Sequence, residues 1–417
     1  MSKRTKKTLV PNLRFAKFRD TGEWLFMNGN LVFDQITNKN HNSDIPILAI
    51  TQEFGAIPRE KIDYNVSVTD KSIESYKVIE IGDFIISLRS FQGGIEYSDY
   101  KGICSPAYII LRKKNNDDDV NHYFKQYFKT GKFIQDLNRD IEGIRDGKMV
   151  SYKQFSNLLL PRPSREEQQK IADCLSSIDE LITAQSQKLD GLKAHKKGLM
   201  QQLFPAEGEN LPQLRFPEFL DAGEWIENTL GEIATFAKGK GVSKTEVSST
   251  GSQPCIRYGE LYTQYKETIN SVISYTDISP SDLVLSQAND VIIPASGETQ
   301  IDIATASCVL NSGIALGGDL NIIRSKMNGV FLSYYLNNAK KKAIAELAQG
   351  ISVIHLYSSQ LKTLKINVPN IAEQQKIADC LSSIDELITA IAQKLDALKT
   401  HKKGLMQQLF PLVEGEV

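Results

Sequence analysis

The chain has 417 residues, of which 41% are hydrophobic and 24% charged, and its formal net charge is −1 at pH 7. This composition excludes a disordered chain and is typical of a soluble globular protein long enough to form two or more cores. The near-zero charge excludes a uniformly basic coat, so any nucleic-acid binding has to be concentrated in local basic patches.

The basic amino terminus is followed by a segment that the chain spells twice. Residues 11–24 read PNLRFAKFRDTGEW, and residues 212–225 read PQLRFPEFLDAGEW. No apolar stretch of signal-peptide length follows the basic residues, and no segment approaches the roughly 20 apolar residues of a membrane span. We therefore expect a cytoplasmic protein with an internal repeat, each copy of which begins at this lead-in.

Each lead-in is followed by a body whose short, β-branched apolar runs predict strands at 84–88, 107–111, 291–295 and 320–324. Residues 121–140 and 329–348 carry apolar residues at helical spacing and predict helices. An aromatic trio lies on one face of each predicted helix, which favours a place in the core over stacking on bases; the trios are Phe124, Tyr127 and Phe128, and Phe331, Tyr334 and Tyr335. Each body is thus predicted to be a small α+β domain.

Each copy ends in a long helix whose sequence is almost unchanged between residues 167–205 and residues 373–411. Ser164 and Asn370 stand three residues before a glutamate and are expected to cap the helix starts. Apolar residues recur at alternating spacings of four and three, which is the a/d pattern of a coiled coil. The positions predicted to pair are Ile171, Leu175, Ile178, Ile182, Leu189 and Leu192 in the first helix, and Ile377, Leu381, Ile384, Ile388, Leu395 and Leu398 in the second.

We expect these two helices to pair with each other in the antiparallel direction. A parallel pair in register would set Lys196 against Lys402 within the seam, whereas an antiparallel pair separates the two lysines. The predicted fold is therefore two small α+β domains separated by two long antiparallel coiled-coil helices and related by a pseudo-twofold axis. The predicted boundaries are a lead-in at 1–24, a first domain at 25–163, a helix at 164–205, a linker at 206–228, a second domain at 229–369, a helix at 370–411 and a tail at 412–417.

The helices are nearly identical while the bodies share only a frame. This contrast fits a protein that recognises two different targets with one architecture. The alternative is that recombination homogenised the helices without functional meaning.

Five segments resemble the specificity (S) subunits of type I restriction-modification systems. They are LRFPEF…GEW, GKGVSKTE…IRYGEL, NDVIIPASG, VPNIAEQQKIADCLSSIDELI and KKGLMQQLFP, with counterparts in the first half. The first body departs from the pattern at 36–62, where the Gly-Lys-rich loop of the second body is missing. The resemblance implies two target-recognition domains that read a split DNA sequence, and helices that dock two methyltransferase subunits. Through these subunits it also implies contact with ATP-dependent nuclease-translocase subunits.

The resemblance further implies a non-catalytic chain, and the sequence agrees. It contains neither an Asn/Asp-Pro-Pro-Tyr/Phe methyltransferase motif nor a GxxxxGK[ST] phosphate loop, and no cofactor is expected. Five cysteines without CxxC spacing indicate neither a disulfide framework nor a zinc site. The three aspartates at 117–119 are predicted to form a solvated turn between a strand and a helix rather than a metal site.

Candidate DNA contacts are polar and basic residues in predicted loops, because Lys and Arg hold phosphates while polar side chains read base edges. In the second body they are Lys238, Lys240, Ser243, Lys244, Arg257, Tyr258, Gln349 and His355. In the first body they are Lys39, His41, Arg89, Gln92, Arg145 and Lys148. A solvated surface loop is the alternative for each of them taken singly.

Two rival functions stay open at this point. A coiled-coil scaffold that binds only proteins would show no salt-sensitive affinity for duplex DNA. A stand-alone nuclease or methyltransferase would need a metal or cofactor constellation that the sequence lacks.

Overall fold

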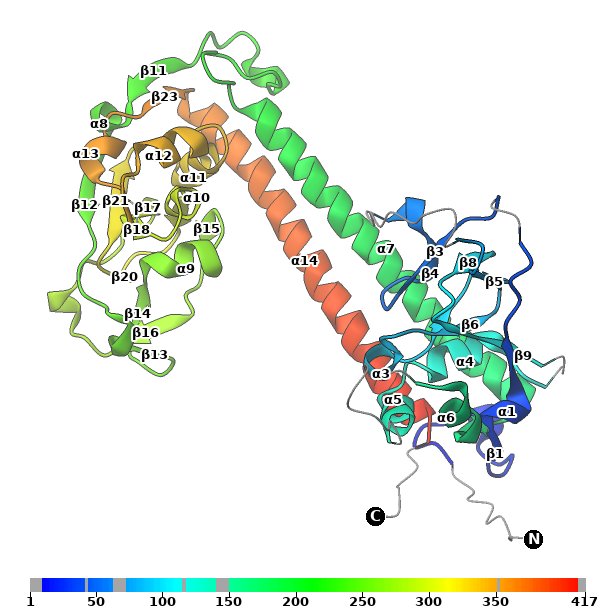
Figure 1. The fold of residues 1–417 in the computed structure, drawn as a ribbon. Helices are drawn as coiled ribbons and strands as arrows, with labels where there is room; N and C mark the ends of the chain where they lie inside the picture. The colour runs from blue at the N-terminus through cyan, green and yellow to red at the C-terminus, as the bar shows by residue number, and fades with distance from the viewer. Residues whose placement is uncertain are drawn as a thin grey trace. The chain divides into compact units, whose positions relative to one another are not determined.

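The computed structural model describes residues 10–41, 44–62, 73–114, 118–139, 150–350 and 353–411. It divides into two compact units, one formed by residues 1–186 with 393–417 and the other by residues 187–392. Each unit contains a body of strands and short helices together with part of both long helices, α7 (Arg165–Leu203) and α14 (Ile371–Leu409) (Figure 1). The α+β class predicted from the sequence is confirmed.

The body of the first unit is a set of short strands with helices packed against them. Its strands are β1 (Leu25–Asn28), β2 (Phe33–Ile36), β3 (Leu48–Thr51), β4 (Gly55–Pro58), β5 (Lys77–Ile79), β6 (Phe84–Ile86), β7 (Glu96–Tyr97), β8 (Gly102–Cys104), β9 (Ile109–Lys113) and β10 (Leu159–Arg162). Its short helices are η1 (Ala16–Phe18), α1 (Gly29–Val32), η2 (Arg59–Lys61), α3 (Ser90–Gly93), α4 (Asn121–Tyr127), α5 (Gly131–Asn138) and α6 (Tyr152–Asn157). The main sheet is antiparallel in the order β2-β9-β6-β7, and the pairs β3-β4, β5-β8 and β1-β10 flank it.

The body of the second unit repeats this plan with a larger sheet. Its strands are β11 (Ile226–Thr229), β12 (Ala234–Lys238), β13 (Val247–Ser248), β14 (Gln253–Ile256), β15 (Thr268–Ile269), β16 (Ser274–Thr276), β17 (Asp290–Pro294), β18 (Ser296–Gly297), β19 (Ser307–Val309), β20 (Ala315–Leu316), β21 (Leu320–Ser325), β22 (Ile354–His355) and β23 (Lys365–Val368). Its short helices are η3 (Pro217–Phe219), α8 (Leu230–Ile233), η4 (Lys244–Glu246), α9 (Tyr258–Thr263), η5 (Pro280–Asp282), α10 (Gln300–Ile303), α11 (Gly329–Asn337), α12 (Lys341–Leu347) and α13 (Ser358–Leu361). The strand orders are β12-β21-β17-β19-β15, β13-β16-β14-β20, β18-β22 and β11-β23.

The four predicted strands are confirmed as β6, β9, β17 and β21, which form the centre of the two main sheets. An aspartate at the start of each central strand holds the neighbouring strand through an arginine. Asp83 pairs with Arg112 of β9 at 2.7 Å, and Asp290 pairs with Arg324 of β21 at 2.9 Å. The repeated Asp of the DFII and DVII segments is therefore a structural residue in both units.

The aromatic trios are core residues, as predicted, with at most 5% of any side chain exposed. The single helices predicted around them were wrong, because each stretch is two helices, α4 with α5 and α11 with α12. The Thr130 hydroxyl donates to the Tyr127 carbonyl at the end of α4 and accepts from the Phe133 amide at the start of α5. In each stretch the two helices bury their apolar residues on the same side, so the helical spacing of these residues continues across the break.

The long helices begin at the predicted caps. The Glu167 amide donates to Ser164 Oγ at 3.3 Å, and the Glu373 amide donates to Asn370 Oδ1 at 2.9 Å. The next residue of each helix binds back to the body, since Gln168 accepts from the Val120 amide and Gln374 from the Asn328 amide, both at 2.9 Å. The two helix starts are therefore fixed to their bodies in the same way.

Each lead-in fastens one end of each long helix inside its own unit. Arg14 forms a bidentate ion pair with Glu167 at 2.7 Å, and the Leu13 amide donates to the Gln408 carbonyl near the end of α14. In the second unit Arg215 pairs with Glu373, and the Leu214 amide donates to the Gln202 carbonyl near the end of α7. The repeated LRF…GEW segment is thus a clamp on the helices.

Within each unit the two long helices run in opposite directions. In the first unit Lys402 of α14 bonds Asp179 of α7 at 2.7 Å, and in the second Lys196 of α7 bonds Asp385 of α14 at 2.8 Å. Both lysines lie in predicted seam positions, and the sequence reading missed their aspartate partners. The predicted pairing residues are buried except Ile182, Leu192, Leu395 and Leu398, which are half-buried.

Candidate nucleic-acid interface

In the second unit a lysine-rich loop leaves the edge strand β12 and lies on the turn between β20 and β21. Lys238, Lys240, Ser243 and Lys244 are all exposed. The Lys240 amide donates to the Leu316 carbonyl, and the Gly318 amide donates to the Gly241 carbonyl at 2.7 Å. A Cβ at Gly239 would overlap the Gly317 carbonyl, so only glycine permits this close approach. The loop therefore has a fixed backbone with free cationic side chains.

The charge of this loop is not neutralised by its surroundings. Lys238 lies 3.7 Å from Asp319, and both side chains are more than half exposed, so this ion pair is weak. Among the described residues, Lys240 and Lys244 form no ion pair. The arrangement suits contact with a phosphate backbone.

The same turn brings the other predicted residues of the second unit to this edge. The Gly317 amide donates to the Ile256 carbonyl, directly before the half-buried Arg257 and Tyr258. The Ala295 amide donates to the Asp319 carbonyl, and the Leu356 amide donates to the Ala295 carbonyl. Segments far apart in sequence thus meet at the ends of β14, β17 and β20.

Gln349 and His355 lie at this edge as an exposed pair. Their backbones exchange hydrogen bonds of 2.9 and 2.7 Å, and His355 of β22 pairs with Ser296 of β18. The His355 ring stacks on Tyr357 with centroids 6.1 Å apart and an interplanar angle of 18°. Tyr357, which is 56% exposed, was missed by sequence reasoning, although it follows the predicted loop directly.

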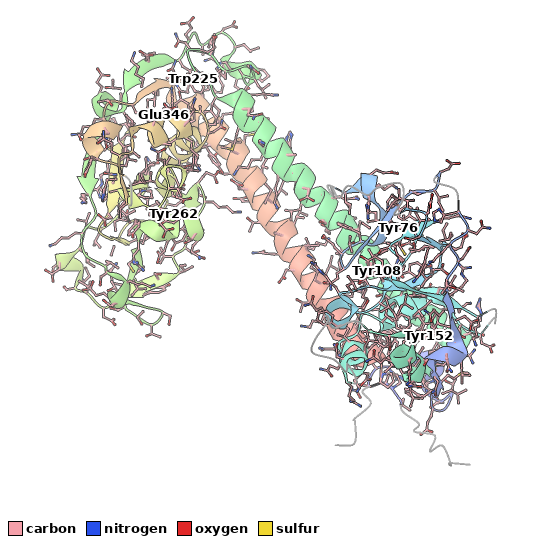
Figure 2. All side chains as sticks on the ribbon, in the orientation of Figure 1. Tyr76, Tyr108, Tyr152, Trp225, Tyr262 and Glu346 are labelled. Atoms are coloured by element: carbon pink, nitrogen blue, oxygen red, sulfur yellow. The ribbon has the colours of Figure 1, made fainter. Side chains whose placement is uncertain are left out.

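In the first unit the equivalent strand end carries Arg89. This exposed residue follows the central strand β6, and the exposed Gln92 lies on the short helix α3 that comes next. Beside them is a hollow of about 610 Å³ whose wall includes Arg89, Ser87, Ser105 and Tyr108. Tyr108 is labelled in Figure 2. The sequence missed this hollow because its wall comes from separate segments.

Lys39 lies close enough to Lys77 of β5 to act on its charge, and His41 contacts the residue before that strand. The Asn38 carbonyl accepts from the Val78 amide of β5, and His41 Nε2 lies 3.2 Å from the Tyr76 carbonyl. Lys77 of the same strand donates to the Tyr108 carbonyl at 2.6 Å. Burial is the main cause that lowers the pKa of Lys77, and the charge of Lys39 lowers it further.

Sequence reasoning also missed the hairpin that closes the hollow. Gln52 and Phe54 form the tip between β3 and β4, and Arg59 follows β4. The available signal was the apolar run before Thr51 and the Gly55 after it, which together predict a strand and a turn. Arg145 and Lys148 lie outside the described residues, as do Asn42 and residues 351–352 of the predicted loops.

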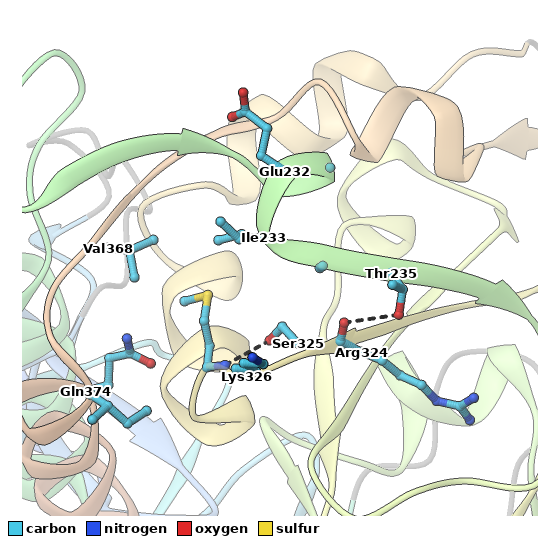
Figure 3. Close-up of a pocket in the computed structure, with 12 residues that line it drawn as sticks. Glu232, Ile233, Thr235, Arg324, Ser325, Lys326, Val368 and Gln374 are labelled. Carbon is cyan, nitrogen blue, oxygen red and sulfur yellow. Dashed lines mark hydrogen bonds between the residues drawn. The ribbon is translucent and has the colours of Figure 1, made fainter.

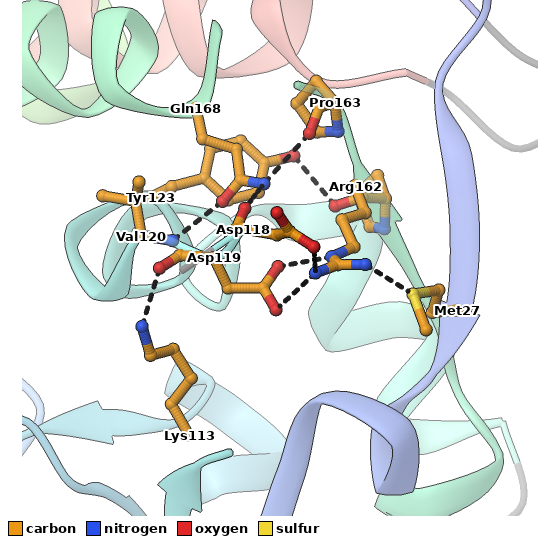
Figure 4. Close-up of polar contacts among 10 residues, drawn as sticks. Met27, Lys113, Asp118, Asp119, Val120, Tyr123, Arg162, Pro163 and Gln168 are labelled. Atoms are coloured by element: carbon orange, nitrogen blue, oxygen red, sulfur yellow. Dashed lines mark hydrogen bonds and ion pairs between the residues drawn. The ribbon is translucent and has the colours of Figure 1, made fainter. Parts of the chain in front are cut away.

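The aspartate turn at 118–119 corrects a prediction, while Asp117 lies outside the described residues. The turn separates β9 from α4, as expected, but Asp119 is only 2% exposed and is not solvated. Arg162 of β10 binds it at 2.6 and 3.0 Å and binds the exposed Asp118 at 3.3 Å (Figure 4). This network links the first body to the start of α7 and is structural.

The second unit has a hollow of about 790 Å³ at the corresponding place. Val368 stands where the first unit has Arg162, and the loop from β21 to α11 is shorter than the loop from β9 to α4. Ile233, Lys326, Val368 and Gln374 line the hollow (Figure 3). Val368 carries no charged group, so it cannot form the network that Arg162 forms with the aspartates of the first unit.

Neither a metal cluster nor an activated thiol is found in the part of the chain that the structure describes. No group of three or more His, Cys, Asp or Glu side chains among those residues could hold a metal ion. Burial raises the pKa of Cys104 and Cys308 to about 12 and that of Cys255 to about 11, which disfavours the nucleophilic thiolate. No helix within the described ranges is long and apolar enough to cross a membrane.

The family model for the type I restriction modification DNA specificity domain matches the chain twice, at residues 21–194 and 222–400. A type I restriction enzyme specificity subunit, MjaVIII of Methanocaldococcus jannaschii, is 24% identical over 361 residues, covering 83% of this chain and 81% of that protein. A putative MjaX specificity subunit of the same organism is 24% identical and covers 84% of this chain and 82% of its own length. The crystal structure of a type I restriction-modification S subunit from M. genitalium has a similar fold, with a TM-score of 0.59 at 16% identity, covering 97% of this chain and all of that one.

Proposed function

Because the chain belongs to the family defined by the type I restriction modification DNA specificity domain, we propose that it is the DNA-recognition subunit of a type I restriction-modification complex. Each body, at residues 25–163 and 229–369, reads one half of an interrupted DNA target. The chain itself is non-catalytic, and the chemistry belongs to its methyltransferase and nuclease-translocase partners.

One observation carries this proposal. The two units share the contacts that hold the helices, while the strand ends that face outward carry different polar and basic residues. A subunit that reads two different half-sites needs the same helix-holding contacts in both units and a different DNA-facing surface on each. The exposed lysines of 238–244 and Arg89 supply the phosphate-binding charge that such reading needs.

The long helices set the distance between the half-sites in this proposal. They pair along the full a/d seam as a coiled coil and dock two methyltransferase subunits, one for each copy of the repeated sequence. Through these subunits the chain recruits the ATP-dependent nuclease-translocase. The complex acts in the cytoplasm, where the DNA it modifies is found.

The proposal is tested by expressing the chain with its cognate methyltransferase subunit in a host that lacks DNA methylation, and by mapping the modified bases. We expect one motif of two short specific parts around a fixed unspecified gap. Purified chain alone should transfer no methyl group. The rival function, a protein-binding coiled-coil scaffold, predicts no methylation motif and no salt-sensitive affinity for duplex DNA.

A further inference from the structure

The β3-β4 hairpin of the first unit presents an aromatic side chain to solvent at its tip. Phe54 is 56% exposed, although large aromatic side chains usually bury most of their area. It lines the hollow of about 610 Å³, which Arg89 and the exposed Leu88 also line. An exposed aromatic ring that lines an open polar hollow is accessible to a ligand that enters the hollow.

The tip is rigid, so Phe54 is held in this position. The Phe54 amide donates to Thr51 Oγ1 at 2.9 Å, and this hydroxyl donates to the Gly55 carbonyl at 3.2 Å. Gly55 has a φ of 68°, and a Cβ there would overlap the Tyr97 carbonyl oxygen. The turn therefore depends on this glycine and on the threonine, not on any contact that Phe54 makes.

The hairpin is also tied to the residue that carries the positive charge. Gln52 Nε2 donates to the Arg89 carbonyl at 3.2 Å, and the Gln52 side chain packs against Gly93 of α3. The Arg89 guanidinium forms no ion pair with any described residue. The apolar Phe54 ring and the Arg89 side chain, which forms no ion pair with a described residue, thus line one and the same hollow.

The second unit has no such tip. In the second unit β14 pairs in parallel with β20. In the first unit Ile47, just before β3, forms a parallel bridge to Ile103 of β8. The two pairings match, so β14 and β3 are equivalent strands of the two bodies. β14 continues into Arg257 and helix α9, on which Tyr262 lies (Figure 2). The second surface presents its exposed aromatic residue, Tyr357, at the start of helix α13 and not at a hairpin tip, so the two recognition surfaces differ here.

From this geometry we infer that Phe54 is a wedge that stacks on a nucleobase and partly unstacks one base step of the first half-site. The inference rests on the proposed function. Apolar side chains that insert between base pairs act in this way in DNA-bending proteins, where nearby cations hold the flanking phosphates. Arg89 would hold such a phosphate, and the polar wall of the hollow, from Gln52 and Ser105, would face the displaced base edge.

The experiment uses the full chain in complex with its methyltransferase and a duplex of the mapped target. A 2-aminopurine, whose emission rises when it leaves the base stack, is placed in turn at each position of the first half-site. We expect a rise at one step with the wild-type complex and none with F54A. Replacement of Phe54 by Ala should weaken binding by about 5- to 150-fold, the range of one lost base-aromatic stack.

Two further variants separate a wedge from general damage. F54W should restore the affinity, because it keeps an aromatic face; its fluorescence is not compared, because a stacked indole quenches 2-aminopurine. Leu159→Ala, which removes an equally exposed apolar side chain from β10 of the same unit, should change neither. If the wild-type complex binds its target but no position brightens and F54A binds as tightly, Phe54 is not a wedge, although the proposed function stands. If the complex fails to bind the mapped target at all, the proposed function itself fails.

Discussion

The two units carry the same contacts around the long helices and different surfaces at their strand ends. Arg14 with Glu167 and Lys402 with Asp179 in the first unit have counterparts in Arg215 with Glu373 and Lys196 with Asp385 in the second. The outer edge presents an aromatic hairpin tip in one unit and a lysine-rich glycine loop in the other. This comparison indicates that the repeated residues hold the long helices, and that the residues between the repeats can differ without changing that role.

The largest expected effect comes from separating the units. Each body packs against the residue that follows one long helix: Phe410, after α14, contacts Tyr127 in the first unit, and Phe204, after α7, contacts Tyr335 in the second. Since both helices end in KKGLMQQLFP, a fragment that ends near Glu209 can supply the missing helix from a second copy of itself. We expect the fragment and its methyltransferase to methylate an interrupted palindrome built from the first half-site, because a twofold dimer matches a palindromic site.

A fragment from about Leu211 to Val417 should do the same with the second half-site. Methylome mapping of both fragments is the measurement. An asymmetric motif, or an unchanged full-length motif, would falsify the two-unit interpretation. A fragment that fails to fold is recognised by circular dichroism and set aside.

The next effect is the loss of a buried ion pair at a helix start. Glu167 and Glu373 are each 1% exposed, so replacing either by Ala leaves a buried arginine unpaired and should destabilise the chain by about 3–5 kcal/mol. Glu373 also accepts from Trp225 Nε1 at 3.2 Å, whereas the Trp24 Nε1 has no hydrogen-bond partner. We therefore expect E373A to cost more than E167A in urea unfolding.

Glu166→Ala is the matched control for this pair. Its partner Lys17 is largely exposed, and so is Glu166, so the change should destabilise the chain far less than E167A does. Equal losses of unfolding free energy for all three variants would show that the two buried ion pairs stabilise the chain no more than an exposed ion pair does.

A smaller effect is expected at the lysine-aspartate pairs between the helices. Asp385 accepts from Lys196 and from the Tyr334 hydroxyl, while Asp179 accepts from Lys402 and Gln126. D385N should cost about 1–3 kcal/mol and D179N a similar amount. The charge-exchanged pair K402D/D179K should recover part of the loss, and a double-mutant cycle measures this coupling. Additive losses without recovery would contradict a direct pair.

Substitutions in the lysine-rich loop should separate phosphate contacts, which position the chain on DNA, from base contacts, which read the sequence. Replacing Lys238, Lys240 and Lys244 by Ala should weaken binding to all DNA sequences and lower the slope of log affinity against log salt by up to about 0.9 for each lost phosphate contact. Lys342→Ala, on α12 of the same unit, removes an exposed lysine that pairs with Glu346 and should leave the slope unchanged. Wild-type affinity and slope in the triple variant would remove the loop from the interface.

The smallest effect concerns Glu96 of β7, whose place in the second unit is taken by Ser307 of β19. Burial raises the pKa of Glu96 above 4.5, although Lys129 at 2.7 Å opposes the shift. The folded chain then binds a proton more readily than the unfolded chain, so this group reduces stability as pH rises from 4.5 through the raised pKa. The difference in unfolding free energy between wild type and E96Q should grow with pH across that window and be flat above it.

Sequence by itself determined the elements that depend on local pattern. The repeats, the caps Ser164 and Asn370, the central strands and the long helices all follow from residue spacing, because capping and amphipathic periodicity act between neighbours in the chain. The core placement of the aromatic trios followed for the same reason. The break between α4 and α5 could not be predicted from the sequence, because both helices bury their apolar residues on the same face. The spacing of those residues is therefore the same on both sides of the break.

Tertiary structure alone decided which distant side chains meet. Asp119 was predicted to be solvated because its partner Arg162 lies on β10, 43 residues further along the chain. Gln52 binds the Arg89 carbonyl, and Lys196 binds Asp385, by the same kind of long-range contact. Such contacts depend on how strands and helices pack, and neighbouring residues do not encode that packing.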